Sequence, residues 1–174
     1  MAVRRIIELG DPLLRETSIE VTDPKEAIAT LLDLRDTLHE FQRTHGFGRG
    51  IAAIQIGIPQ RVIYIEIDGQ VYELVNPDFE FLSEEKFQMW DDCFSFPNLM
   101  VHLERSKAVA LRYQDRDGTE RRIEAADAFA ELLQHEVDHL DGILSIDRAL
   151  DPKHSLMTRS EYLRTLEKNQ LSRA

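Results

Sequence analysis

Cysteine is almost absent from this sequence, because Cys93 is its one thiol. A disulfide within the chain is therefore excluded, and a reducing compartment, the cytoplasm, is expected. Long apolar runs are missing too, and none approaches the ~18 residues of a membrane span. The first ten residues lack a long apolar core and a small-residue cleavage site, so no signal peptide is expected there.

Positive charge is also scarce, since 21 Lys and Arg against 32 Asp and Glu give a formal net charge of -11. An acidic surface repels phosphate backbones and anionic lipids, so we expect neither specific nucleic-acid binding nor membrane association. Internal repeats, low-complexity tracts and Pro/Gly/Ser linkers are not found. We therefore expect residues 1–174 to form a single domain.

The patterns that are present predict a mixture of helices and short antiparallel strands. A helix is expected from Pro24 to about Arg43, with Asp23 as its N-cap. A second should begin near Asp127 and end near Gly142, and a third should cover about residues 155–168. Strands are expected in pairs around Asp-Gly turns, at residues 62–67, 71–75, 109–113 and 121–123. This order favours an α+β fold.

The strongest chemical signal is the segment from Gln134 to Gly142, which contains the pattern H-E-x-x-H. His135 and His139 are four residues apart, so on a helix they lie about 40° apart around the axis and one turn along it. Both imidazoles can therefore reach one metal ion, with Glu136 beside them as a general base. Apolar residues around this helix predict burial, where an imidazole pair is costly unless it is paired or metallated.

Two other segments are ambiguous when taken by themselves. Cys93 is either a third metal ligand or a small buried hydrophobe. In the segment from Gly48 to Gln55, glycines and alanines would allow another backbone to approach closely. The amide of Gln55 could stabilise a developing oxyanion, but the same segment could be a tight turn leading into the core.

Together and in this order, the three segments resemble the three signature motifs of peptide deformylases, G-x-G-x-A-A-x-Q, E-G-C-x-S and Q-H-E-x-D-H-x-x-G. The first is intact from Gly48 to Gln55, and the third is intact from Gln134 to Gly142. The second is altered to Asp-Asp-Cys-Phe-Ser at residues 91–95. The resemblance covers about residues 3–165, and it implies antiparallel strands around a buried metal-binding helix.

The resemblance implies that Cys93, His135 and His139 bind one divalent metal ion. It favours Fe(II) in cells, with Zn, Ni or Co as replacements in preparations. The donor set by itself, two imidazoles and one thiolate, suggests zinc. The two expectations differ, and the sequence does not choose between them.

The implied activity is removal of the formyl group from the N-terminal formyl-methionine of nascent polypeptides, with transient contact to the ribosome. Glu136 would take a proton from the attacking water and deliver it to the leaving amine. Gln55 and the backbone N–H of Phe94 would hold the formyl oxygen. Gly50 and its neighbours would pair with an extended substrate backbone.

The pocket for methionine is expected to be apolar, with Ala128 among its lining residues. The residues expected to contact the substrate come from all three motif regions: Gly48, Arg49, Gly50, Asp92 and Leu132.

Arg49 and Asp92 depart from the family pattern, in which these positions hold an apolar residue and a glycine. One hypothesis is an ion pair between Arg49 and Asp92 across the mouth of the cleft. Another is that Arg49 binds the carboxylate of a very short substrate, and a third is that both side chains are simply exposed. On the metal-binding helix, Asp138 is expected either to pair with Arg105 or to be a surface carboxylate.

Two other functions remain open from the sequence. The chain could be a divergent amidohydrolase that acts on another small N-acyl compound. It could also be a non-catalytic relative that uses the fold as a binding module, although the retained Glu136 and Gln55 argue against this.

Overall fold

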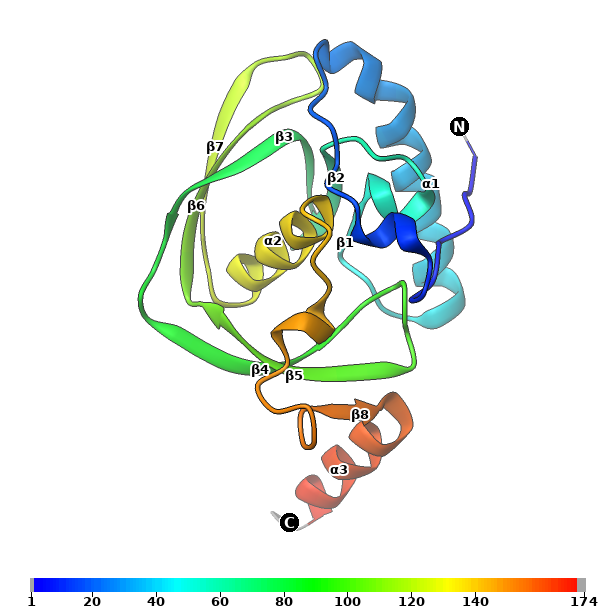
Figure 1. The fold of residues 1–174 in the computed structure, drawn as a ribbon, viewed down its shortest axis with the longest axis vertical. Helices are drawn as coiled ribbons and strands as arrows, with labels where there is room; N and C mark the ends of the chain where they lie inside the picture. Colours follow the sequence, from blue (N-terminus) through cyan, green and yellow to red (C-terminus); the bar gives the residue numbers. More distant parts are fainter. Residues whose placement is uncertain (1, 172–174) are drawn as a thin grey trace.

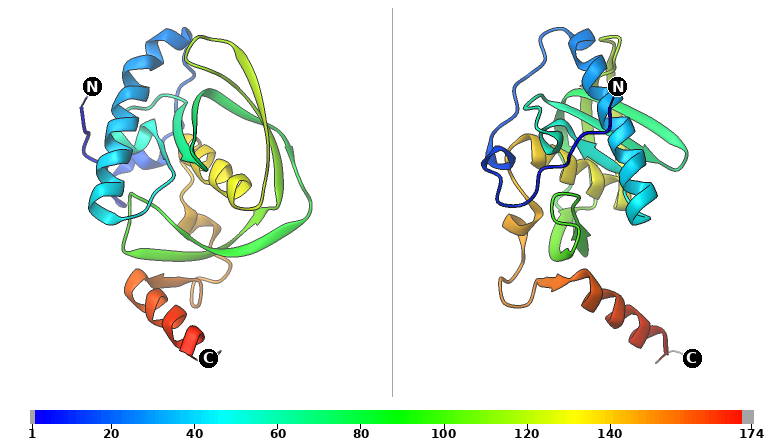
Figure 2. Two further views of the ribbon diagram at one scale, coloured as in Figure 1. Left: turned by 180° about the vertical axis from the view of Figure 1, so that it is seen from behind. Right: turned by 90° about the vertical axis from the view of Figure 1, so that its right-hand side faces the viewer.

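The computed structural model describes residues 2–171 (Figures 1 and 2). Three α-helices are found in this range: α1 (Ile28–His45), α2 (Asp127–Leu140) and α3 (Arg159–Leu171). The strands are β1 (Gly50–Ala52), β2 (Val62–Ile67), β3 (Gln70–Leu82), β4 (Lys86–Asp92), β5 (Leu99–Ser106), β6 (Ala108–Gln114), β7 (Glu120–Ala126) and β8 (Leu156–Thr158). Within the described range, no helix is long and apolar enough to cross a membrane.

The strands form two antiparallel sheets. One sheet has five strands in the order β1-β2-β3-β6-β7, and the other has three in the order β4-β5-β8. Figure 1 shows α2 in the middle of the molecule, enclosed by strands of both sheets, while α3 extends away from the body. Helix α2 contacts β1, β5 and β7, so both sheets help to position it. The architecture confirms the α+β prediction.

The alternation of side chains along β2 explains why α1 and α2 lie on opposite faces of the larger sheet. Val62 and Tyr64 pack in one core cluster with the leucines of α1. Ile63 and Ile65 pack in another cluster with α2 and with the inner side chains of β3 and β6. Since successive side chains of a strand point to opposite faces, β2 is buried on both sides.

The Asp-Gly turns confirm the predicted hairpins. Asp68 and Gly69 both have positive φ, 52° and 75°, which is the backbone that a two-residue type I′ turn requires. They join β2 to β3, whose register pairs Ile67 with Gln70. Strand β3 continues well beyond the predicted 71–75, because it pairs next with β6 through two register shifts.

The predicted helices are found, but their ends differ. The first begins with a 3-10 turn, Pro24–Ala27, in which the Asp23 side chain accepts a hydrogen bond from the Lys25 N–H at 3.0 Å. Asp127 was expected to cap the second helix, but it is the first residue of α2, and Ala126, which has no capping side chain, precedes it in extended conformation.

The third helix starts later than predicted, at Arg159 rather than near residue 155. The reason is that residues 156–158 are held as strand β8, which pairs with the start of β5. Strands β4 and β5 were not predicted, because their sequences mix charged, aromatic and aliphatic residues, and β8 was not predicted because it has only three residues.

Candidate metal centre

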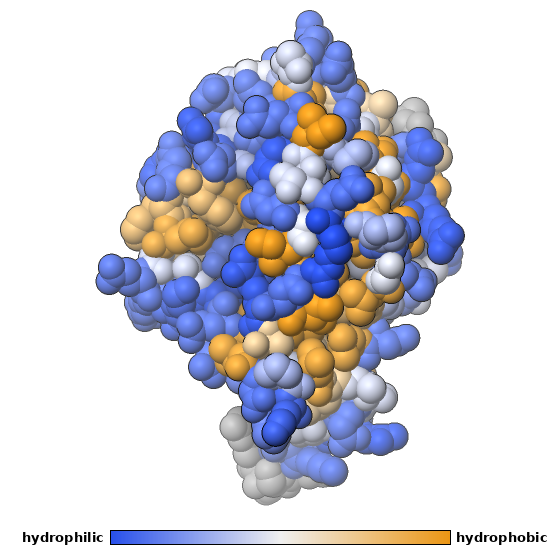
Figure 3. Space-filling view, viewed as in Figure 1, coloured by the Kyte–Doolittle hydropathy of each residue, from blue (hydrophilic) through white to orange (hydrophobic). Residues whose placement is uncertain are grey.

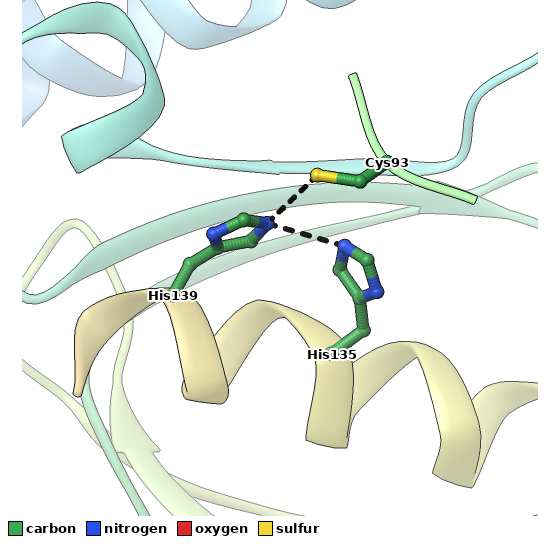
Figure 4. A group of neighbouring side chains, drawn as sticks. All are labelled: Cys93, His135 and His139. Atoms are coloured by element: carbon green, nitrogen blue, oxygen red, sulfur yellow. Dashed lines mark hydrogen bonds between the residues drawn. The ribbon is translucent and has the colours of Figure 1, made fainter. Parts of the chain in front are cut away.

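Cys93, His135 and His139 converge on one point in the interior (Figure 4). Cys93 directly follows β4, and both histidines lie on the inward face of α2. The Cys93 Sγ atom is 3.2 Å from His139 Nε2, which is in turn 3.2 Å from His135 Nε2. All three side chains are buried. The structure thus brings together the three residues that the resemblance assigns to a metal.

The donor set fits a tetrahedral metal ion. Around such an ion, ligand distances of 2.0–2.3 Å place neighbouring nitrogen and sulfur atoms about 3.3–3.6 Å apart. The three ligand atoms here lie within 4.8 Å of one another, and the two shortest separations are close to that requirement. In addition, Nδ1 of His139 is buried with no hydrogen-bond partner among the described residues. The arrangement therefore fits a site for a divalent metal ion.

The surroundings of the two histidines shift their pKa values in opposite directions. His135 Nδ1 donates a hydrogen bond to Asp91 Oδ2 at 2.9 Å, which leaves Nε2 to face Cys93 and His139. Burial opposes its charge, but the Asp91 carboxylate raises the pKa of His135 well above its ordinary value. Burial and the nearby His135 lower the pKa of His139 well below its ordinary value. Asp91 therefore fixes the orientation of one ligand, as is usual for histidines that bind metals.

Burial raises the pKa of the Cys93 thiol. Without a cation nearby, this thiol would be protonated and inert. A coordinated thiol is instead deprotonated outright. The buried position of Cys93 is therefore suited to a ligand, and less to a free nucleophile.

Glu136 follows His135 on α2, and its carboxylate lies close to Gly50 of β1. Its carboxylate is buried, and Oε2 has no hydrogen-bond partner within residues 2–171. Burial raises the pKa of Glu136 to about 7. A Cβ atom added at Gly50 would lie 2.8 Å from Glu136 Oε1, so a larger residue at that position would displace this carboxylate. A carboxyl group in this state can both accept and donate a proton near neutral pH.

Gln55 presents its amide N–H groups to the same centre. Its Oε1 accepts a hydrogen bond from the Ala52 N–H at 2.9 Å, which fixes the direction of the amide. Its Nε2 is 3.3 Å from Ser95 Oγ and 3.6 Å from Cys93 Sγ. Gln55, the last residue of the first motif, is thus placed as a hydrogen-bond donor beside the Cys93 thiol.

Phe94 follows Cys93 and packs into the core cluster of α1. Its ring stacks on Phe41 with centroids 3.8 Å apart. A Cβ atom at Gly48 would come within 2.4 Å of the Phe94 ring, so the first glycine of the motif is required by this close approach. The Phe94 ring is therefore held between the Phe41 ring and the backbone at Gly48.

A network of ion pairs connects α2 to neighbouring segments of the chain. Arg105 forms ion pairs with Asp138 and, at 3.4 Å, with Asp91. Arg148 also binds Asp138, with its Nε 2.6 Å from Oδ2. The predicted pairing of Asp138 with Arg105 is confirmed. Through Asp91, the network reaches the imidazole of His135.

Two of the three candidate metal ligands, Cys93 and His135, line a cleft of about 370 Å³. Its lining contains all the catalytic and substrate-contacting candidates of the sequence. Five further residues complete the lining: Phe47, Asp91, Cys93, Glu131 and His135. Ala128 lies outside this lining, although Arg49 contacts its carbonyl group. The cleft as a whole is strongly polar, because five of its lining side chains are carboxylates or a guanidinium, and the apolar pocket for methionine stays a prediction.

Arg49 and Asp92 do not pair with each other, so the hypothesis of an ion pair across the cleft mouth is wrong. Arg49 Nη2 binds Glu131 Oε2 at 2.8 Å instead. Asp92 binds Arg159 at the start of α3, and the Arg159 guanidinium lies 3.9 Å from the centroid of the Phe47 ring. Each residue pairs with a partner that is distant in sequence, and no local pattern could have identified that partner.

Sequence reasoning missed Glu131. It is buried on α2 one turn before His135, and burial together with the Asp91 carboxylate raises its pKa, which the Arg49 guanidinium opposes. Its spacing of four residues from His135 was available as a signal, because residues i and i+4 share one face of a helix.

Comparisons with known proteins agree with this geometry. Residues 3–155 match the family model described as polypeptide deformylase. The peptide deformylase of Bartonella tribocorum is 38% identical over 177 residues, which cover 97% of each chain.

Solved structures show the same likeness. The crystal structure of peptide deformylase from Thermotoga maritima superposes with a TM-score of 0.81 at 32% identity, over 87% of this chain and 100% of that one. A peptide deformylase from Acinetobacter baumannii, solved with Met-Ala-Ser bound, superposes with a TM-score of 0.74 at 28% identity, over 84% of this chain and 98% of that one. The chain belongs to the polypeptide deformylase family.

Proposed function

We propose that this chain is a metal-dependent hydrolase that removes the N-formyl group from the formyl-methionine of nascent polypeptides. The observation that carries the proposal is the buried Glu136 carboxylate, which borders the same cleft as Cys93 and His135. One proton carrier beside one set of metal ligands is the minimum that amide hydrolysis by an activated water requires.

Cys93, His135 and His139 would hold the metal ion in this proposal. When bound, the ion supplies a water whose pKa is lowered from 15.7 to about 7, and thus a nucleophile at neutral pH. We propose Fe(II) as the ion in cells, with zinc, nickel or cobalt as replacements. The thiolate and imidazole donors support any of these divalent ions.

Glu136 would accept the proton of the attacking water through Oε2, which has no other partner within the described residues. Its pKa of about 7 supports both this step and the later delivery of the proton to the leaving amine. The formyl oxygen becomes negative as the carbon turns tetrahedral. The Gln55 Nε2 group and the Phe94 backbone N–H would donate hydrogen bonds to it, and loss of one such donor typically costs about 3 kcal/mol of transition-state stabilisation.

Strand β1 supports a way to bind the peptide. It pairs with β2 on one side and forms an edge of the five-stranded sheet on the other. Gly50, at the start of β1, also lines the cleft. An extended peptide could therefore add to this edge as a further strand, with its N-terminus directed to Glu136.

The bound Met-Ala-Ser of the Acinetobacter relative supports a peptide that begins with methionine as the substrate. We further propose that the protein acts in the cytoplasm and meets its substrates through transient contact with the ribosome. Both proposals follow from the proposed substrate, because a nascent chain is still bound to a ribosome in the cytoplasm.

Anaerobic purification, metal analysis and an assay with formyl-Met-Ala-Ser test the proposal. We expect about one metal ion per chain and release of formate. Acetyl-Met-Ala-Ser is the matched control, because it differs only in the acyl group. Hydrolysis of the acetyl peptide alone would favour an amidohydrolase of different specificity, and no turnover of any acyl peptide by metal-loaded protein would favour a binding module.

A further inference from the structure

Glu131, His135 and His139 form one line along the inward face of α2. They are spaced by four residues, so each is one helical turn, about 5–6 Å, from the next. Carboxylate oxygens of Glu131 and Asp91 lie with a nitrogen of His135 within 4.8 Å of one another. A substrate group that extends from the reacting amide along α2, toward the start of the helix, therefore meets Glu131 next.

Arg49 closes this part of the cleft from the opposite wall. Its Nη2 donates to Glu131 Oε2 at 2.8 Å, and its Nη1 donates to the Ala128 carbonyl oxygen at 3.3 Å. The Glu131 side chain is only 2% exposed, whereas the Arg49 side chain is 41% exposed. Both residues line the cleft. The guanidinium thus faces the cleft while it is held in place by a buried carboxylate.

We propose that the Arg49–Glu131 pair determines specificity, and that it selects formyl peptides whose first side chain carries a neutral hydrogen-bond acceptor over those with an aliphatic side chain of the same length. This inference rests on the proposed deformylase activity, and it goes beyond the formyl-methionine substrate proposed above because it ranks a glutamine side chain over methionine. It concerns the side chain next to the formyl group, whereas the chemistry depends on Glu136 and the metal ligands.

The charges around the pair explain why a neutral group is favoured. A cationic side chain would compete with Arg49, whose guanidinium already neutralises Glu131. An anionic side chain would approach the carboxylates of Asp91, Glu131 and Glu136, which line the same cleft. The same repulsion and the two contacts that Arg49 already makes argue against the hypothesis that it binds a substrate carboxylate.

Hydrogen-bonding capacity explains why an acceptor is favoured over an aliphatic group. A guanidinium has five N–H donors, and within residues 2–171 Arg49 makes hydrogen bonds to Glu131 and Ala128 alone. An aliphatic side chain in the cleft would remove water from those remaining donors that face the cleft without replacing its hydrogen bonds, which is unfavourable. The methionine thioether is a weak acceptor and is expected to rank between the two.

The test compares three substrates of matched side-chain length, formyl-Gln-Ala-Ser, formyl-Met-Ala-Ser and formyl-norleucine-Ala-Ser, with metal-loaded protein. We expect kcat/KM to fall in that order. A ratio of kcat/KM for the glutamine peptide to that for the norleucine peptide below one overturns the proposal. If none of the three peptides is hydrolysed, the proposed function fails and this inference fails with it.

The double variant Arg49→Met/Glu131→Leu tests the cause, because it replaces the pair by apolar side chains of similar size. We expect the glutamine-to-norleucine ratio to fall at least tenfold, with metal content unchanged, and a smaller fall overturns the proposal. The matched control is Arg43→Met/Glu40→Leu, which removes an exposed ion pair of α1 and should leave the ratio unchanged. If the first variant does not fold, the wild-type ratio decides alone.

Discussion

The two halves of α2 serve the same cleft in different ways. The C-terminal half carries His135, Glu136 and His139, whose spacing follows the signature motif. The N-terminal half carries Glu131, which binds Arg49, the residue that departs from the apolar type expected between the glycines of the first motif. The contrast indicates that the reacting centre of this chain follows its relatives, while the part that would contact the substrate side chain has diverged.

The same contrast divides the segment that precedes the cysteine. Asp91 contacts His135 and so belongs with the reacting centre. Its neighbour Asp92 points to the rim and binds Arg159 from α3. Adjacent residues of a strand point to opposite faces, so one substitution from the family pattern affects a metal ligand and the other affects the cleft mouth.

Removing the metal should give the largest effect on the reacting centre. For Cys93→Ala we expect loss of bound metal and a fall in kcat/KM of more than about 10⁴-fold, because the nucleophile and its Lewis acid are lost together. Metal analysis and formate release measure this. His154→Ala, which changes an exposed histidine, should retain both metal and activity. Full activity in metal-free Cys93→Ala would contradict the proposed centre.

Glu136→Gln should separate proton transfer from metal binding. We expect kcat/KM to fall about 10²–10⁴-fold while metal content is kept, because a positioned acid or base contributes that much. Glu84→Gln, the same change at an exposed glutamate, is the control. Wild-type activity in Glu136→Gln would exclude this carboxylate as the proton carrier.

Asp91→Asn should weaken the metal site without removing a ligand. In the variant, His135 Nδ1 would donate its hydrogen bond to a neutral amide oxygen, which is a weaker acceptor than the carboxylate. We therefore expect metal affinity to fall about 10–100-fold. Titration with a competing chelator measures the affinity. Unchanged affinity would mean that Asp91 does not position this imidazole.

Asp92→Asn should have the smallest effect. Its ion pair with Arg159 is partly exposed, so we expect a loss of less than about 1 kcal/mol in the free energy of unfolding and no change in metal content. Urea unfolding measures the stability. A loss of metal in this variant would erase the distinction between the two adjacent aspartates.

The sequence predicted those parts of the molecule whose pattern is local. The histidine spacing on α2, the turn at Asp68 and the helix that follows Pro24 each depend on residues within a few positions of one another. The α+β class followed from these elements. The position of Cys93 near the histidines came from the resemblance, since 42 residues separate it from His135 and no local rule joins them.

The remainder could not be predicted, because it depends on contacts between distant segments. Arg49 and Glu131 are 82 residues apart, and Asp92 and Arg159 are 67 apart. An exposed ion pair and a buried one have the same sequence signature, so neither the partners nor the polar character of the cleft could be inferred. Strand β8 was missed because only its pairing with β5 makes three residues extended.

The single cysteine of the chain has a practical consequence. Cys93 is 1% exposed and is the only thiol in the sequence, so a thiol-directed reagent has no competing target. A coordinated sulfur is shielded from alkylation and oxidation, and once its ion departs the buried, protonated thiol still reacts only when the surrounding chain opens. The kinetics of labelling by a maleimide should therefore report how often loss of the ion and local opening occur together, one adduct for each exposed thiol.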